Sequence, residues 1–297
     1  TDGTVAGTSQ LKSINPGRGD SGPHDFAKLG DGRLMFQAET GPNEGLWITD
    51  GTTAGTTLVV GSLYASQITA LADGTVAFYG RPVTATGGDA LYVSDGTAAG
   101  TRTVVPINST ALSINTQFIA PLSGGTMLFK ASTAATGSEI GISDGTAAGT
   151  RLLRDINPGP DNTSFADSVV PLGDGRAVFR AYEPATGFEL WITDGTAAGT
   201  TVVATFRNSN STGLPSEFTA VGGKLVFGAD TAGDGVEPWV TDGTVAGTSQ
   251  LKSINPGVGD SGPRYFAKLG DGRLVFQAET GPSEGLWVTD GTPAGTT

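Results

Sequence analysis

The sequence motif that recurs most often in this chain is the eight-residue pattern Ser/Thr-Asp-Gly-Thr-x-Ala-Gly-Thr, which carries one carboxylate. A carboxylate followed by Gly and Thr accepts hydrogen bonds from backbone N–H groups of its own turn, or it binds a cation. A cation site needs several converging oxygens, whereas each copy supplies one carboxylate. The pattern therefore predicts a structural turn. Its aspartates are Asp2, Asp50, Asp95, Asp144, Asp194, Asp242 and Asp290.

Further aspartates lie in Gly-rich loops, where carboxylate and carbonyl oxygens suit Ca²⁺. Their spacing resembles neither an EF-hand nor a nonapeptide calcium repeat. We expect solvated turn residues and no required cofactor, with weak Ca²⁺ binding as the alternative. These loop residues are Asp20, Asp31, Asp161, Asp174, Asp260 and Asp271.

An aromatic side chain stands three residues before most of the repeated aspartates. An exposed row of such rings would make a stacking platform for sugars, whereas a ring at one fixed place in each strand packs between adjacent sheets. The regular spacing favours packing, with ligand stacking as the alternative. Gly141 takes this place once, which predicts a gap or a compensating neighbour there. The aromatic residues are Trp47, Tyr92, Trp191, Trp239 and Trp287.

Groups for general acid–base or nucleophilic catalysis are scarce. His24 is the only histidine, and the chain has no cysteine, so neither a Ser-His-Asp triad nor a usual zinc site can be assembled. A glycosidase needs a pair of carboxylates in one pocket, and no spacing in the sequence indicates such a pair. The sequence therefore predicts no enzyme.

Charge and hydropathy exclude two classes of partner. The net charge is −12 with only 17 Lys and Arg, which disfavours nucleic-acid binding. No apolar run approaches 18 residues, so we expect no membrane insertion. Because the chain begins within a copy of the acidic pattern and lacks an initial Met, we expect it to be a piece of a longer protein.

The elements that position these residues are predicted to be short strands. After each acidic pattern comes a β-branched run such as 200–206, then an apolar stretch such as 218–221, a run containing Phe such as 224–230, and the aromatic run such as 190–193. Each run is bounded by turn residues, as strands are. The Phe positions, which we expect to be buried, are Phe36, Phe78, Phe129, Phe179, Phe227 and Phe276.

Four strands repeated every 45 to 50 residues predict an all-β fold, a β-propeller of four-stranded blades. The chain is expected to be one repeat domain, residues 1–297, with six modules at about 1–49, 50–94, 95–143, 144–193, 194–241 and 242–297. Residues 8–14 are predicted to form a fourth strand that could complete the last blade of a six-bladed ring. A five-module ring and an open superhelix are the alternatives.

The segment Glu189–Thr196 (ELWITDGT), followed by Ala-Ala-Gly-Thr, resembles the ELWxxDGT repeat of large bacterial surface or secreted proteins. The segment Asp155–Gly159 (DINPG) resembles a loop of the same family, and the turn is similar to the Asp-box of sialidases. The resemblance implies an extracellular or cell-surface propeller. Three modules lack the Glu and carry Gly45, Ala90 or Gly285 instead, so they are expected to lack its contact.

Residues 1–57 and 241–297 are identical at 50 of 57 positions, which indicates that five modules form a higher repeating unit. From this duplication and the resemblance we expect an extracellular structural or adhesive module of a long, filament-forming array. A glycan-binding, lectin-like propeller is the alternative, and a sialidase-like glycosidase is less favoured. The expected partners are the protein itself or neighbouring modules, and surface glycans.

Overall fold

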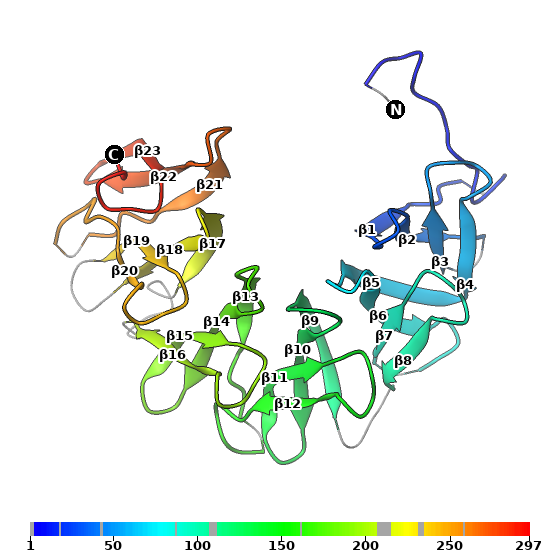
Figure 1. Ribbon diagram of the computed structural model, residues 1–297, viewed down its shortest axis with the longest axis horizontal. Coiled ribbons are helices and arrows are strands. Elements are labelled where there is room, and N and C mark those ends of the chain that lie inside the picture. The colour runs from blue at the N-terminus through cyan, green and yellow to red at the C-terminus, as the bar shows by residue number, and fades with distance from the viewer. Residues whose placement is uncertain are drawn as a thin grey trace. The chain divides into compact units, whose positions relative to one another are not determined.

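A computed structural model describes residues 3–17, 19–41, 44–86, 88–106, 112–160, 162–206, 215–230, 235–257 and 259–297. The described residues form β-strands and no helix (Figure 1). Asp2 and Asp161, named above, lie outside this part of the chain. Among the described residues no helix could span a membrane.

The strands form six antiparallel sheets, in each of which strands that follow one another in sequence are neighbours. Sheet 1 contains β1 (His24–Lys28), β2 (Leu34–Glu39), β3 (Glu44–Thr49) and β4 (Thr57–Gly61), and sheet 2 contains β5 (Leu63–Ala70), β6 (Val76–Pro82), β7 (Ala90–Ser94) and β8 (Arg102–Val105). Sheet 3 contains β9 (Ser113–Pro121), β10 (Met127–Thr133), β11 (Gly137–Ser143) and β12 (Arg151–Arg154).

The three later sheets repeat this order. Sheet 4 contains β13 (Asp167–Pro171), β14 (Ala177–Glu183), β15 (Gly187–Thr193) and β16 (Thr201–Thr205). Sheet 5 contains β17 (Ser216–Val221), β18 (Lys224–Asp230), β19 (Val236–Thr241) and β20 (Ser249–Gln250). Sheet 6 contains β21 (Arg264–Lys268), β22 (Leu274–Thr280) and β23 (Ser283–Thr289). The module boundaries drawn at the aspartates thus fall between the third and fourth strands.

The core of each sheet lies on its second and third strands. All six predicted Phe side chains are at most 3% exposed, which confirms their assignment to the core. Five of them pair across the ladder with the aromatic residue of the next strand, as Phe36 does with Trp47 and Phe179 with Trp191. Directly opposed side chains in antiparallel strands lie close enough to pack, so these pairs hold the two strands together.

The first strand of most sheets contains a β-bulge that turns one residue toward the next sheet. The ladder register shifts between His24 and Ala27 in β1, and between Arg264 and Ala267 in β21. The extra residue has a left-handed backbone, with φ of 53° at Asp25 and 58° at Tyr265. A bulge of this kind bends the strand and re-aims one side chain.

The expectation of a strand at residues 8–14 is wrong. No strand is assigned there, and Leu11 is 37% exposed. The same sequence at 248–254 contains β20, which pairs with Trp239 and Val240 of β19. A strand needs a neighbour that satisfies its N–H and C=O groups, and no described strand lies beside 8–14.

The chain divides into two compact units, Thr1–Thr133 with Gly141–Arg151, and Ala134–Ile140 with Leu152–Thr297. In the first unit, a buried cluster joins sheets 1 and 2 through residues such as Met35, Leu46 and Leu63. In the second unit, one cluster joins sheets 4 and 5 and another joins sheets 5 and 6. Each unit is described by itself.

Candidate interaction surface

The repeated aspartates bind their own turns. In the first copy that the structure describes throughout, the backbone N–H and the hydroxyl of Thr52 donate to Asp50 Oδ1 at 2.8 and 2.7 Å, and Gly55 N–H donates to Thr52 Oγ1 at 2.9 Å. The hydroxyls of Thr49 and Thr56 lie 2.7 Å apart and join the two ends. The same bonds to the carboxylate recur at Asp95, Asp144, Asp194, Asp242 and Asp290.

Two glycines make this turn possible. Gly51 has a φ of 87°, which L side chains rarely adopt. A Cβ on Gly55 would lie 2.0 Å from Asp50 Oδ1. The hydroxyl and N–H of Thr52 lower the pKa of Asp50, so its carboxylate stays charged while it holds the turn. Among the described residues, no group of three His, Cys, Asp or Glu could hold a metal ion.

The loop aspartates are likewise engaged by nearby protein groups. Asp31, Asp174 and Asp271 each form an ion pair at 2.7 Å with the Arg two residues later. Asp260 Oδ1 accepts the Val236 N–H at 2.8 Å. Asp20 is exposed, and its backbone carbonyl accepts the amide of Asn15. Weak Ca²⁺ binding at these loops stays a prediction.

The aromatic side chains that precede the repeated aspartates pack against other side chains. Trp47 is 8% and Trp191 is 3% exposed, and Tyr92 stacks on Phe78 with ring centroids 5.2 Å apart. Trp239 meets Phe206 edge to face, and Lys252 Nζ lies 5.5 Å over the ring of Trp287. These contacts leave little ring surface for a sugar.

At the exceptional Gly141, the Phe of the neighbouring strand takes the space of the missing ring. A Cβ there would lie 2.9 Å from Phe129 Cζ and 3.0 Å from Ala131 Cβ. The compensating neighbour is therefore Phe129, which is fully buried.

A buried glutamate links the third strand to a loop that lies 17 residues later. Glu237 accepts the backbone N–H groups of Ile254 and Asn255, both at 2.9 Å, and the hydroxyl of Ser261 at 2.7 Å. Glu139 accepts Ile156 and Asn157 N–H at 3.1 Å in the same way. We call this arrangement the glutamate staple. In the sequence, each staple appears as a Glu in the third strand followed downstream by Ile-Asn-Pro-Gly. The sequence shows both features but does not indicate that they are in contact.

Glu189 is also fully buried but forms no such staple among the described residues. Neither of its carboxylate oxygens has hydrogen-bond geometry with a described partner. Burial raises the pKa of Glu189, and the hydroxyls of Thr186 and Thr205 and the backbone N–H of Phe206 offset part of that rise. Its downstream segment begins with Phe206 instead of Ile-Asn-Pro-Gly.

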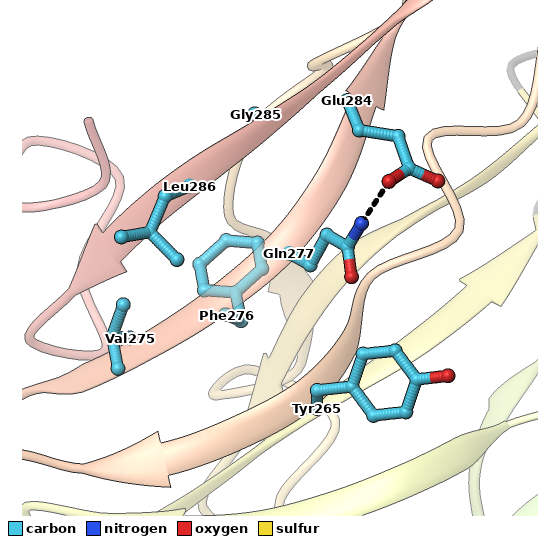
Figure 2. Close-up of a pocket in the computed structure, with 7 residues that line it drawn as sticks. All are labelled: Tyr265, Val275, Phe276, Gln277, Glu284, Gly285 and Leu286. Atoms are coloured by element: carbon cyan, nitrogen blue, oxygen red, sulfur yellow. Dashed lines mark hydrogen bonds between the residues drawn. The ribbon is translucent and has the colours of Figure 1, made fainter.

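An open apolar depression of about 400 Å³ lies on sheet 6. Figure 2 shows its lining, with Leu286 and Val275 at one end, Tyr265 on the bulge of β21, and the Gln277 amide donating to Glu284. Tyr265 is 73% and Leu286 78% exposed, unusually high for side chains of this size. We call these five residues the sheet 6 face.

The equivalent residues of sheet 1 are covered. Met35, Gln37 and Leu46 occupy the positions of Val275, Gln277 and Leu286, and all three are fully buried. Strand β5 of the next sheet contacts β1, β2 and β3 and provides the cover. The sheet 6 face is thus a surface whose near-identical copy forms an interface elsewhere in the chain.

No family model and no curated protein sequence matches this chain. Among solved structures, a prolyl endopeptidase aligns with 93% of this chain and 42% of its own, at 12% identity and a TM-score of 0.57. Oligogalacturonate lyase in complex with manganese aligns with 88% of this chain and 72% of its own, at 12% identity and a TM-score of 0.53.

A puromycin-hydrolyzing peptidase of Mycobacterium tuberculosis aligns with 86% of this chain and 42% of its own, at 14% identity and a TM-score of 0.50. This chain therefore spans less than half the length of the two peptidases. The fold is a β-propeller fold. The choice among five blades, six blades and a superhelix stays a prediction.

These comparisons correct the predicted function. The similar structures described above are two peptidases and a lyase, and they give no evidence of an adhesive surface repeat. The prediction of an extracellular structural or adhesive module, with a lectin-like propeller as its alternative, is therefore wrong. At these identities the likeness establishes the fold alone, and it decides neither for nor against an enzyme.

The single histidine is the first residue of β1. His24 is exposed, and its Nδ1 lies 2.8 Å from the Gly22 carbonyl. In the duplicate the position is Arg264, which pairs with Glu279 and Glu284. The described residue types thus offer packing and hydrogen-bonding surfaces, among them the sheet 6 face with its exposed Tyr265 and Leu286 side chains.

Proposed function

We propose that this chain is a non-catalytic propeller domain that binds another polypeptide through the sheet 6 face. The observation that supports this is the contrast between Leu286, which is 78% exposed, and its copy Leu46, which is fully buried. An apolar depression rimmed by polar groups is typical of a protein-binding surface. Tyr265 offers the large amphipathic ring that such surfaces favour.

The distribution of carboxylates supports the non-catalytic part of the proposal. The repeated aspartates are occupied by their turns, and two of the three buried glutamates in the third strands are occupied by backbone N–H groups. A hydrolase needs a nucleophile or a carboxylate pair directed at a common pocket. On the sheet 6 face the one lining carboxylate, Glu284, is bound by Gln277 and Arg264.

Because the chain has no cysteine, single thiols can report on the face. In the Leu286→Cys variant we expect the thiol to react with a maleimide nearly as fast as a free thiol. In the matched Leu46→Cys variant, reaction should be slower by at least about 100-fold, because it requires local opening. Equal, slow rates at both positions would refute the proposed function, since the face would then already be covered.

Two further measurements complete the test. An apolar fluorescent dye should bind the full chain, and Leu286→Asp should abolish most of that signal without lowering the unfolding midpoint. Assays with prolyl peptides and oligogalacturonate, chosen because the structural neighbours are peptidases and a lyase, should show no turnover. Turnover that co-purifies with the chain and disappears in a single carboxylate variant would contradict a non-catalytic domain.

A further inference from the structure

The interface between sheet 1 and sheet 2 shows what a face of this kind binds. Met35, Leu46 and Ile48 form one buried cluster with Leu63, Ala65 and Ile68. The last three residues belong to β5 and its bulge, so this strand supplies much of the apolar cover, and Val76 and Phe78 of β6 belong to the same cluster. Met35, Leu46 and Leu63 are all at most 3% exposed.

Gln37 fixes the register of that strand through its backbone. Its Nε2 donates to the Leu63 carbonyl at 3.3 Å, and its Oε1 accepts the Ala65 N–H at 3.2 Å. Nε2 also donates to Glu44 Oε2 at 2.6 Å, which orients the amide. An amide that meets a C=O and an N–H two residues apart recognises an extended strand in one register, whatever its side chains.

The position of Gln37 reaches the following sheet in other modules too. Tyr79 is its equivalent in sheet 2, and the Tyr79 hydroxyl donates to the Phe118 carbonyl of β9 at 2.7 Å. Arg180 is its equivalent in sheet 4, and it donates to the Pro215 carbonyl just before β17 at 3.5 Å. The residue type varies, but in each of these sheets a long polar side chain in the second strand contacts the chain at the next first strand.

Sheet 6 has the same apolar surface and the same Gln–Glu pair as sheet 1, but its surface is exposed. Gln277 is paired with Glu284 as Gln37 is with Glu44 (Figure 2), and Leu286 beside them is 78% exposed. Three of the seven differences between the two copies change the fit of an occupant on this face. Val275 and Val288 replace Met35 and Ile48, so the surface stays apolar and leaves more room.

The third difference is Tyr265, which replaces Asp25. Asp25 Oδ2 accepts the Gln67 N–H of β5 at 3.0 Å. Tyr265 offers an aromatic ring in place of that carboxylate, so an occupant gains apolar contact where β5 has a hydrogen bond. The combined changes permit a strand like β5, including one with larger side chains at the positions of Leu63 and Ala65.

We infer that the polypeptide recognised by the sheet 6 face is a further module of this chain's own kind, which presents a first strand like Leu63–Ala70 with its backbone held by Gln277. The inference rests on the proposed function of this face. The occupant's defining chemistry is an extended strand with apolar residues at the positions of Leu63, Ala65 and Ile68, and a free C=O and N–H two residues apart.

The test is a chain extended after Thr297 by a second copy of residues 58–106, which follow the duplicated segment in this sequence. The Leu286→Cys thiol should lose reactivity by about 100-fold in the extended chain relative to the unextended one. A control extension with Asp at the positions that copy Leu63 and Ile68 should leave the thiol reactive, and circular dichroism should verify that both chains are folded.

A second variant tests the role of Gln277. Gln277→Leu in the extended chain should return part of the reactivity of the Leu286→Cys thiol, about 10-fold, and Gln37→Leu should do the same for the Leu46→Cys thiol. Extensions that leave the thiol at position 286 fully reactive would overturn the inference, while the open apolar face and the proposed function would stand. Protection of that thiol in the unextended chain that grows with protein concentration would support the inference with a second copy of the chain as the source of the module.

Discussion

Replacement of Glu237 by Gln is the sharpest test of the glutamate staple. The side chain is fully buried, and its two oxygens accept the N–H groups of Ile254 and Asn255 and the hydroxyl of Ser261. The substitution keeps the shape and one carbonyl oxygen but puts an NH₂ group opposite a donor. One buried N–H is then left without an acceptor.

The expected loss follows from these bonds. A hydrogen bond to a charged acceptor contributes about 1.5 to 3 kcal/mol, and a buried N–H that loses its partner costs about 1 to 3 kcal/mol. We therefore expect Glu237→Gln to lower the free energy of unfolding by about 2 to 4 kcal/mol. Tryptophan fluorescence in a urea titration measures this, and amide hydrogen exchange at Ile254 and Asn255 should accelerate.

Glu189→Gln is the matched control. Its carboxylate is equally buried, but among the described residues it lies near a single backbone N–H, that of Phe206, and burial raises its pKa. Neutralising it should cost less than about 1 kcal/mol. Equal losses in the two variants, or a loss below about 1 kcal/mol at Glu237, would show that burial rather than the staple determines the effect.

Three further variants and one control variant probe the core and the turn. Phe227→Ala should cost about 3 to 5 kcal/mol in denaturant unfolding because the ring is fully buried, and a cost below about 1 kcal/mol would mean that the strand faces are reversed. Gly199→Ala places a Cβ 2.2 Å from Asp194 Oδ1 and should cost about 1 to 3 kcal/mol, whereas Gly270→Ala, with no atom within 4 Å, should be neutral in the same titration. The hydroxyl and N–H of Thr196 lower the pKa of Asp194 below its usual value of 3.8 in the folded protein. The ionised Asp194 therefore stabilises the fold above pH 3.8, and this stabilisation is lost as the pH falls through the pKa of Asp194 in the folded state. The melting temperature of the Asp194→Asn variant should therefore fall less than that of the parent when the pH is lowered from about 6 to about 2.5. An unchanged pH dependence of the melting temperature would contradict this role of Asp194.

Much of the local structure could be predicted from residue types alone. The acidic turn is defined by residues within eight positions of one another, and each module has a Phe, such as Phe227, at the same place in its second strand. Such features depend on backbone preference and on alternation along one strand, which neighbouring residues determine. The turn, the strands and the buried Phe row follow from them.

The glutamate staple and the Gln37 contact could not be obtained in this way. Glu237 and Asn255 are 18 residues apart, and Gln37 and Ala65 are 28 apart. The sequence of a strand does not indicate which loop or which neighbouring backbone will form hydrogen bonds with its polar side chains. Only the packing of sheets brings these donors and acceptors together.

The duplicated segment separates the two kinds of information most clearly. Leu46 and Leu286 stand in nearly identical sequence, yet one is fully buried and the other is 78% exposed. Residues 8–14 and 248–254 are identical, yet only the second contains part of a strand. The sequence alone determined the residue types that can be buried or paired. The tertiary structure decided whether a neighbour is present to bury and pair them, because burial and ladder hydrogen bonds both require a second surface.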